Sequence, residues 1–345
     1  MITSVLSIFI TFSIVVFVHE LGHFVMAIKT GVKVYVFSLG FGPELIGFTR
    51  NGIRYRISLI PMGGYVKMKG ENPEDDDARA DDAFMGLDPL KRLLVIIAGP
   101  FMNFVTGMFI FSLIIYLVGL PKFVDKPIIG QVAADSPAYV AGIQSGDVVI
   151  SVNNKNVSTW HQLSEYIGSS EKGSVNIVID REGEVLSFDI IPRMDEEIGR
   201  VLIGITATFE NVKHGLFISL YEGIKYTIVL CLNLLVSLWL MLTGKIAAAV
   251  AGPVGIAKLV TQAAGEGTVY LFQWIALISV NLGFINLFPI PILDGGHVVF
   301  AVIEKIKGKP IDPKKVNIAN VIGLSLILTL LIFVTWKDIV RAFFR

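Results

Sequence analysis

Three ionisable side chains interrupt an otherwise apolar stretch at the start of the sequence. His19, Glu20 and His23 form the pattern H-E-x-x-H, and Glu20 is the only charged residue within 1–28. On a helix, residues four apart lie on one face, so both imidazoles can reach one zinc ion, with Glu20 on the adjoining turn. Ionisable groups inside a membrane span are costly and mark functional sites. The pattern therefore predicts an intramembrane zinc site; the alternative is a pair of buried histidines hydrogen-bonded to neighbouring helices.

A third ligand must come from elsewhere in the chain, because catalytic zinc sites usually take three protein ligands and leave one position for water. Of the three other histidines, His161 and His214 lie in the region expected outside the membrane, which leaves His297, Asp294 and more distant carboxylates. Asp294 is the preferred third ligand, because it ends an apolar window in the string NLFPIPILDGGH. Two prolines break the helix there, and two glycines let the backbone approach closely. His297 is the alternative ligand.

The composition is that of a membrane protein. Hydrophobic residues make up 53% of the 345 residues and charged residues 17%, whereas a soluble domain has roughly 45–50% and about 25%. Lys plus Arg equals Asp plus Glu at 29 each, which leaves no basic stripe for a nucleic-acid partner. The single cysteine, Cys231, excludes an intramolecular disulfide framework and a cysteine-rich metal site. Five windows almost lack charged residues, and each is close to the ~20 residues that span a bilayer: 1–28, 93–120, 226–244, 267–293 and 316–336.

The positive residues set the expected orientation in the membrane. Lys29 and Lys33 follow the first window, so the N-terminus is expected outside and Lys29 in the cytoplasm. If all five windows crossed, Asp294 would lie on the face opposite the histidine end of the first helix. Four crossings bring Asp294 to the same side, provided that 226–244 lies on the outer surface as part of an interfacial segment. The apolar character of 226–244 leaves a spanning course open as well.

Residues 32–68 differ from the apolar windows in their pattern of residues. Alternating runs such as VKVYVFSL and IRYRISLI, with several glycines, predict short β-hairpins. Backbone groups of a strand need partners within lipid, so a strand edge at the membrane face is expected to pair with a locally unwound substrate. The alternative is a rigid plug that only seals the site from lipid. The residues expected to bind the substrate are Gly63, Gly64, Tyr65, Val66, Lys67 and Met68.

Residues 127–207 read as a soluble domain. Short β-rich runs alternate with Gly, Asn, Asp and Ser, and one helix-like stretch covers Trp160 to Ile167. The order of the elements, with SPAYVAGIQSGDVVISVNN near the start and IGRVLIGI at the end, resembles the permuted PDZ domains of bacterial membrane and periplasmic proteases. In such domains a groove beside one strand captures an extended peptide or a carboxy terminus by strand addition. The alternative is a generic β-domain that shields the membrane part.

The motifs as a set resemble those of one family. HELGH, GFGP, PMGGYVKM, AGPFMN at 98–103, the PDZ-like insert and NLFPIPILDGG closely resemble, in the same order, the bacterial site-2 proteases that cut membrane-anchored anti-sigma factors. The resemblance covers nearly the whole chain, with a single PDZ domain. It implies that His19, His23 and Asp294 are zinc ligands and that Glu20 is the general base. It also assigns Asn286 to substrate handling, although Asn286 could instead bridge a broken helix end.

The expected fold is an α-helical polytopic membrane protein of about four transmembrane helices, with a membrane-associated β-hairpin region and an inserted all-β PDZ-like domain. Its expected parts are a membrane region at 1–120, the extracytoplasmic PDZ-like domain at 127–207, an outer interfacial segment at 215–266 and a C-terminal membrane region at 267–345.

The expected function is zinc-dependent hydrolysis of peptide bonds in the membrane segments of single-pass proteins, with anti-sigma factors or signal-peptide remnants as substrates. One Zn²⁺ per chain is the expected cofactor. The PDZ-like domain is expected to bind a peptide or protein tail. The expected location is the bacterial cytoplasmic membrane, with the active site towards the cytoplasm. The competing functions are a non-catalytic membrane scaffold and a metal-ion transporter.

Overall fold

The computed structural model describes residues 2–72, 77–170, 173–195, 200–245 and 251–344. The chain folds into two compact units. The first joins Met1–Ile115 to Gly215–Arg345, and the second is Tyr116–His214. The second unit is therefore an insertion into the chain of the first.

The first unit consists mainly of helices. An α-helix pairs its own backbone groups, which is why a long apolar run can be buried in lipid as a helix. Among the described residues, α1, α2, α5, α7 and α9 are long and apolar enough to cross a membrane. The predicted class of polytopic α-helical membrane protein is confirmed. The helices are α1 (Ile2–Thr30), α2 (Pro89–Val118), α5 (Leu216–Leu242), α6 (Pro253–Glu266), α7 (Thr268–Asn286), α8 (Asp294–Lys307) and α9 (Pro313–Phe344), with a 3₁₀ turn at Phe84–Gly86.

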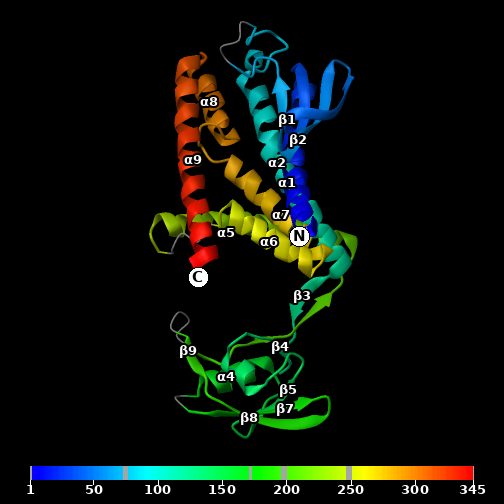
Figure 1. Ribbon diagram of the computed structural model, residues 1–345, viewed down its shortest axis with the longest axis vertical. Helices are drawn as coiled ribbons and strands as arrows, with labels where there is room; N and C mark the ends of the chain where they lie inside the picture. Colours follow the sequence, from blue (N-terminus) through cyan, green and yellow to red (C-terminus); the bar gives the residue numbers. More distant parts are fainter. Residues whose placement is uncertain (1, 73–76, 171–172, 196–199, 246–250, 345) are drawn as a thin grey trace. The chain divides into compact units, whose positions relative to one another are not determined.

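Of these long helices, α1, α2, α7 and α9 run along the bundle and α5 lies across it (Figure 1). α1 and α7 run from the end where α1 begins towards the opposite end, and α2 and α9 run back. α5 crosses this direction beside α6 at the end where α1 begins and α9 ends. Gly223 lets α5 approach α2 closely, since a Cβ there would lie 2.2 Å from Oγ of Ser112. Phe111 of α2 packs on Tyr226 of α5, with ring centroids 4.6 Å apart.

Close packing of small residues brings α1, α2 and α7 together. A Cβ at Gly22 of α1 would lie 2.2 Å from the carbonyl oxygen of Ala98 in α2. A Cβ at Gly107 of α2 would lie 2.3 Å from the side chain of Val280 in α7. Lipid is as apolar as leucine, so close packing of this kind is what holds membrane helices together. The apolar side chains buried between the three helices are Val15, Ile110, Phe111, Ile275, Ala276 and Val280.

The predicted β-hairpin region over 32–68 is confirmed as two long bent strands, β1 (Val34–Arg50) and β2 (Ile53–Met68). Phe37 in the first half of β1 pairs with Val66 on one side and Tyr55 on the other, while Phe48 in the second half pairs with Tyr55. The strand segments therefore lie in the order 64–68, 34–39, 53–58 and 44–50. The segment 64–68 is thus an edge of the sheet.

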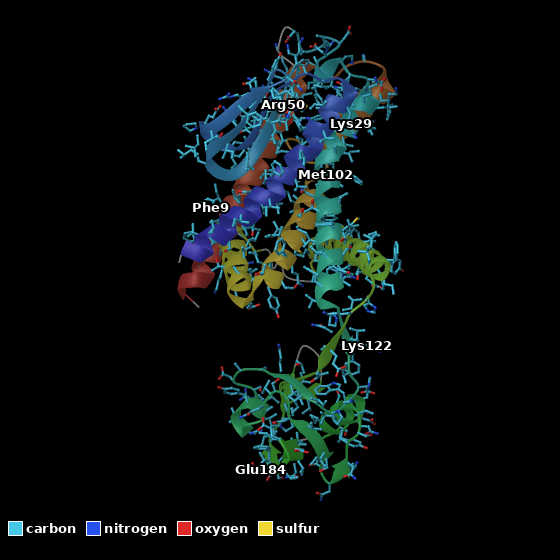
Figure 2. All side chains as sticks on the ribbon, turned by 90° about the vertical axis from the view of Figure 1, so that its right-hand side faces the viewer. Phe9, Lys29, Arg50, Met102, Lys122 and Glu184 are labelled. Carbon is cyan, nitrogen blue, oxygen red and sulfur yellow. The ribbon has the colours of Figure 1, made fainter. Side chains whose placement is uncertain are left out.

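The sheet packs against α1 and α2 at one end of the bundle. Val34, Phe37 and Val66 share a buried cluster with Ala27 of α1 and Val95 of α2. Figure 2 shows Lys29 and Arg50 at this end of the unit and Phe9 towards the other end of α1. The acidic segment 71–82 that follows β2 lies partly outside the described residues, at 73–76.

The second unit is rich in strands. Its four-stranded sheet has the order β6-β5-β7-β8, and three further antiparallel pairs join β11 to β4, β10 to β9 and β12 to β3. The predicted helical stretch from Trp160 to Ile167 is confirmed as α4, capped by Thr159, whose hydroxyl accepts a bond from the Gln162 amide. α4 covers the sheet through Leu163, which is fully buried. The elements are β3 (Leu120–Phe123), β4 (Ile129–Val132), α3 (Pro137–Ala141), β5 (Val148–Val152), β6 (Lys155–Asn156), α4 (Trp160–Gly168), β7 (Val175–Arg181), β8 (Glu184–Ile190), β9 (Arg193–Asp195), β10 (Arg200–Leu202), β11 (Ile205–Ala207) and β12 (Phe209–Val212).

Candidate metal centre

Two histidines of α1 point their outer ring nitrogens at one place. His19 and His23 are one helical turn apart, and their Nε2 atoms lie 3.1 Å from each other. Both side chains are largely buried, at 9% and 12% exposed. The pairing follows from helix geometry, because residues at i and i+4 share a face.

Asp294, the first residue of α8, completes the group. Its Oδ2 lies 3.2 Å from Nε2 of His19, and its Oδ1 lies 3.6 Å from Nε2 of His23. The three residues each offer one ligand atom within 4.8 Å of the other two. Burial alone would raise the pKa of Asp294, but the two adjacent imidazoles lower the pKa below its usual range.

These distances fit a zinc ion. Ligand atoms about 2.0–2.1 Å from a tetrahedral zinc lie roughly 3.3 Å from one another. The two Nε2 atoms are 3.1 Å apart, and each lies 3.2 Å or 3.6 Å from one of the two carboxylate oxygens of Asp294. Oδ2 of Asp294 is buried and has no hydrogen-bond partner within the described residues. Two imidazole nitrogens and a carboxylate oxygen are also a ligand set that zinc prefers. The residues present therefore fit the metal.

The ligand group opens into a cavity of about 330 Å³. Glu20 lines this cavity, and its carboxylate accepts a hydrogen bond from the backbone amide of Val66. Gly64 lets the strand approach α1, since a Cβ there would lie 3.3 Å from Cγ of Glu20. The titratable and amide side chains lining the cavity are His19, Glu20, His23, Tyr65, Glu71, Asn286, Asp294 and His297.

The remaining sequence candidates divide into two groups. Tyr65, Val66 and Met68 line the cavity, and Nδ2 of Asn286 lies 3.4 Å from Nε2 of His19. Gly63 instead packs against the ring of Phe41, and Lys67 is exposed; neither lines the cavity. His297 lines the cavity one turn after Asp294, but it is not one of the three residues whose ligand atoms converge.

Comparison with known proteins agrees with this geometry. The family model for peptidase family M50 matches residues 7–330 of the chain. The chain belongs to peptidase family M50. A relative from Clostridium acetobutylicum is 36% identical over 336 residues, which cover 96% of each chain.

Two further relatives are named as proteases. The zinc metalloprotease RasP of Geobacillus kaustophilus is 29% identical, covering 99% of this chain and 98% of its own. The regulator of sigma-W protease RasP of Bacillus subtilis is 27% identical, covering 99% of each chain. The predicted enzyme class and cofactor are confirmed: this M50 protein is a site-2 type zinc metalloprotease of the membrane. Among solved structures, the PDZ domain of an SdrC-like protein from Listeria monocytogenes matches 26% of this chain and 93% of its own, with 23% identity and a TM-score of 0.22.

The M50 histidines are held by α2 through their inner ring nitrogens. Nδ1 of His23 is hydrogen-bonded to the carbonyl oxygen of Val95 at 2.9 Å, so Nδ1 carries the proton and Nε2 is free for metal. Nδ1 of His19 is hydrogen-bonded to the side-chain amide of Asn103 at 3.1 Å. Asn103 is fully buried, and Ser279 of α7 donates to its backbone carbonyl at 3.0 Å.

Asn103 was not among the sequence candidates for the M50 site. The sequence does mark Asn103 as unusual, because it is the lone side-chain amide in the apolar window 93–120, at the end of the string AGPFMN. A buried amide needs hydrogen-bond partners, but the sequence does not show which helix supplies them. The contact joins residues 84 positions apart, which no local pattern reveals.

The second unit of this M50 protein contains a separate cavity of about 710 Å³. Trp160, Leu163 and Ile167 of α4 form one wall, and residues 201–205 form the other. A cavity between a helix and extended backbone is a geometry suited to an extended peptide.

Proposed function

We propose that His19, His23 and Asp294 bind the catalytic zinc and that this centre hydrolyses peptide bonds in the membrane segments of single-pass proteins. One observation carries the proposal. The three ligand atoms converge within 4.8 Å although they come from α1 and α8. The open side of the group faces the cavity lined by Glu20 and the sheet edge, where a substrate can enter.

Zinc at such a centre supplies a Lewis acid for the scissile carbonyl and an activated water. Glu20 takes the proton from the attacking water and delivers it to the leaving nitrogen, as general base and then general acid. Asn286 donates from Nδ2 to the peptide oxygen as it gains negative charge. The position of this amide, 3.4 Å from Nε2 of His19, supports that role.

The segment 64–68 binds the substrate as an added strand. A helical segment exposes no carbonyl to a zinc centre until it unwinds, and unwinding in lipid leaves backbone groups without partners. Just beyond the ends of β1 and β2, the Lys69 amide donates to the Lys33 carbonyl at 2.9 Å. By alternation along the strand, the amides of Val66 and Met68 therefore point away from the sheet. Those two amides meet the carboxylates of Glu20 and Glu71. Their position beside the ligand group supports strand addition there.

Four helices, α1, α2, α7 and α9, cross the membrane, and α5 lies on the outer surface with α6. The transverse course of α5 and the shared direction of α1 and α7 support this topology (Figure 1). The end of the bundle with Lys29 and Arg50 is cytoplasmic, and the basic segment 305–315 belongs to it. The four parts are then the membrane regions 1–120 and 267–345, the outer segment 215–266 and the extracytoplasmic domain 127–207.

The domain at 127–207 is PDZ-like and binds the tail of a client protein in the cavity beside α4. The substrates are single-pass proteins of the bacterial cytoplasmic membrane, either anti-sigma factors or signal-peptide remnants. The name of the Bacillus subtilis relative, regulator of sigma-W protease, supports the first class.

The test is cleavage of a tagged single-pass substrate by the purified protein in detergent. Wild type is expected to cleave it, and either a zinc chelator or Glu20→Gln is expected to abolish cleavage. Glu20→Gln is expected to keep its zinc, because Glu20 is not one of the three converging ligands. Cleavage that survives Glu20→Gln would contradict the assignment of the general base.

A further inference from the structure

The loop that leads into Asp294 contains a strained residue. Ile292 has φ of +80°, a region that a β-branched side chain rarely adopts. The residue lies two positions before Asp294 and lines the cavity of the metal centre. Strained backbone of this kind persists only where the surrounding structure holds it in place.

A single peptide unit of this loop is held on both sides by α9. The amide of Ile292 donates to Oδ1 of Asn320 at 3.2 Å. The carbonyl of Pro291, which belongs to the same peptide unit, packs against Gly323, where a Cβ would lie 2.1 Å from its oxygen. Asn320 and Gly323 are three residues apart and therefore share a face of the helix. On that face, Asn320 accepts the hydrogen bond from the Ile292 amide, and Gly323 leaves space for the Pro291 carbonyl oxygen.

The orientation of this peptide unit sets the position of Asp294, the residue at which α8 begins. The Leu293 amide donates back to the carbonyl of Ile290 at 3.1 Å. A Cβ at Gly295 would lie 2.2 Å from the carbonyl oxygen of Phe288, so the first turn of α8 is folded tightly onto the loop. Between these close contacts, φ of Ile292 is the torsion that directs the chain towards the histidines. Relaxation of Ile292 to a negative φ would move the carboxylate of Asp294.

We propose that Asn320 and Gly323 are positioning residues for the zinc ligand Asp294, acting through the peptide unit between Pro291 and Ile292. The inference rests on the proposed ligand set. α9 then has a role in the metal centre although its side chains do not reach the ligands. Rotation or displacement of α9 would loosen the third ligand while the two histidines of α1 stay in place.

The test is zinc affinity of the full chain in detergent, measured by competition with a chromogenic chelator. Partners that orient a metal ligand are typically worth about 10–100-fold in affinity, so Asn320→Ala is expected to weaken zinc binding roughly tenfold. Asn317→Ala, an exposed amide on the same helix, is the matched control and is expected to leave affinity unchanged. The absorption spectrum of the cobalt-substituted protein is expected to change only in the Asn320 variant.

Ile292→Gly supplies the decisive second variant. Glycine adopts a positive φ without strain, so the loop no longer needs Asn320 to hold it. The double variant Ile292→Gly with Asn320→Ala is expected to recover most of the lost affinity, which a variant that merely misfolds would not do. Wild-type affinity in Asn320→Ala, or no recovery in the double variant, would overturn the inference. Asp294→Ala is the reference: if it keeps wild-type affinity, the ligand set itself fails.

Discussion

Arg92 of α2 and Glu304 of α8 form a buried ion pair between positions 212 residues apart in the chain. Their side chains are only 9% and 10% exposed. Glu304 also accepts a hydrogen bond from the amide of Ile311 at 2.8 Å. Since α2 also holds both histidines through Val95 and Asn103, one helix anchors the elements that carry all three proposed ligands.

Glu304→Ala should therefore destabilise the protein strongly. Removal of one partner leaves the other charge buried and unpaired, which typically costs about 3–5 kcal/mol. The thermal unfolding midpoint in detergent measures the effect. Lys305→Ala is the control, because its pair with Asp88 is half exposed on both sides and a surface pair contributes little. Equal shifts for the two variants would show that the Arg92 pair is not buried in the native protein.

Gly99→Ala should prevent zinc binding. A Cβ at Gly99 would lie 2.2 Å from Nε2 of His23, so the ring has to leave the position in which it bonds to Val95. Zinc content after purification measures the loss. Gly265→Ala in α6 is the matched control, because no atom lies within 4 Å of a Cβ at that position. Full zinc content in Gly99→Ala would mean that His23 binds metal from a different position.

Val66→Pro should abolish cleavage and leave zinc in place. Proline removes the amide that points away from the sheet beside Glu20, whereas Val66→Ala keeps it and is expected to remain active. Substrates with glycine or proline near the cut should be cleaved faster, because they unwind more easily. Activity in Val66→Pro together with no effect of substrate helicity would exclude strand addition, and the edge would then serve as a plug.

Protonation of Asp147 at acidic pH should destabilise the second unit. Burial alone would raise the pKa of this side chain, which is 1% exposed, but bonds from Arg181 and from the Gln144 amide lower it. A depressed pKa contributes stability above the unfolded value of about 3.9, and this contribution is lost as pH falls through the native pKa. The protection of the β5 and β7 amides against hydrogen exchange, taken relative to their intrinsic exchange rate at each pH, should therefore be steady from pH 7 to about 5 and weaker below about 4.

Asp147→Asn is the matched variant for this acid response. It should speed exchange in β5 and β7 already at pH 7, by the loss of roughly 1–3 kcal/mol of charged hydrogen bonding, and should flatten the acid response. An acid response in the variant as large as in wild type would assign it to another group.

Local pattern explains which parts of the centre could be predicted from sequence. The i, i+4 spacing of His19 and His23 is a property of one helix, and the proline and glycine signals around Asp294 mark a helix break. The edge position of Tyr65 to Met68 cannot be predicted from local pattern, because it depends on Phe37 pairing with both halves of β2. Only the alternating pattern of that region is visible in sequence.

The contacts that reach across the bundle could not be predicted. No local sequence pattern indicates that Asn103 contacts His19 or that Asn320 contacts Ile292. The positive φ of Ile292 could not be predicted either, because β-branched residues rarely adopt it. The course of α5 was equally open, because its apolar length suits a membrane crossing as well as a surface position. Packing against Ser112 and Phe111 of α2 fixes where α5 lies against that helix, and that packing is tertiary.

Zinc bound per chain in Asp294→Ala and His297→Ala tests the proposed ligand set most directly. Elemental analysis of purified wild type should find about one zinc per chain, the number that a single three-ligand site holds. His297→Ala should match wild type, because the ligand atoms of the other three residues already converge without it. Asp294→Ala should retain less than about a tenth. Full zinc in Asp294→Ala together with loss in His297→Ala would contradict the proposed centre and assign the third ligand to His297.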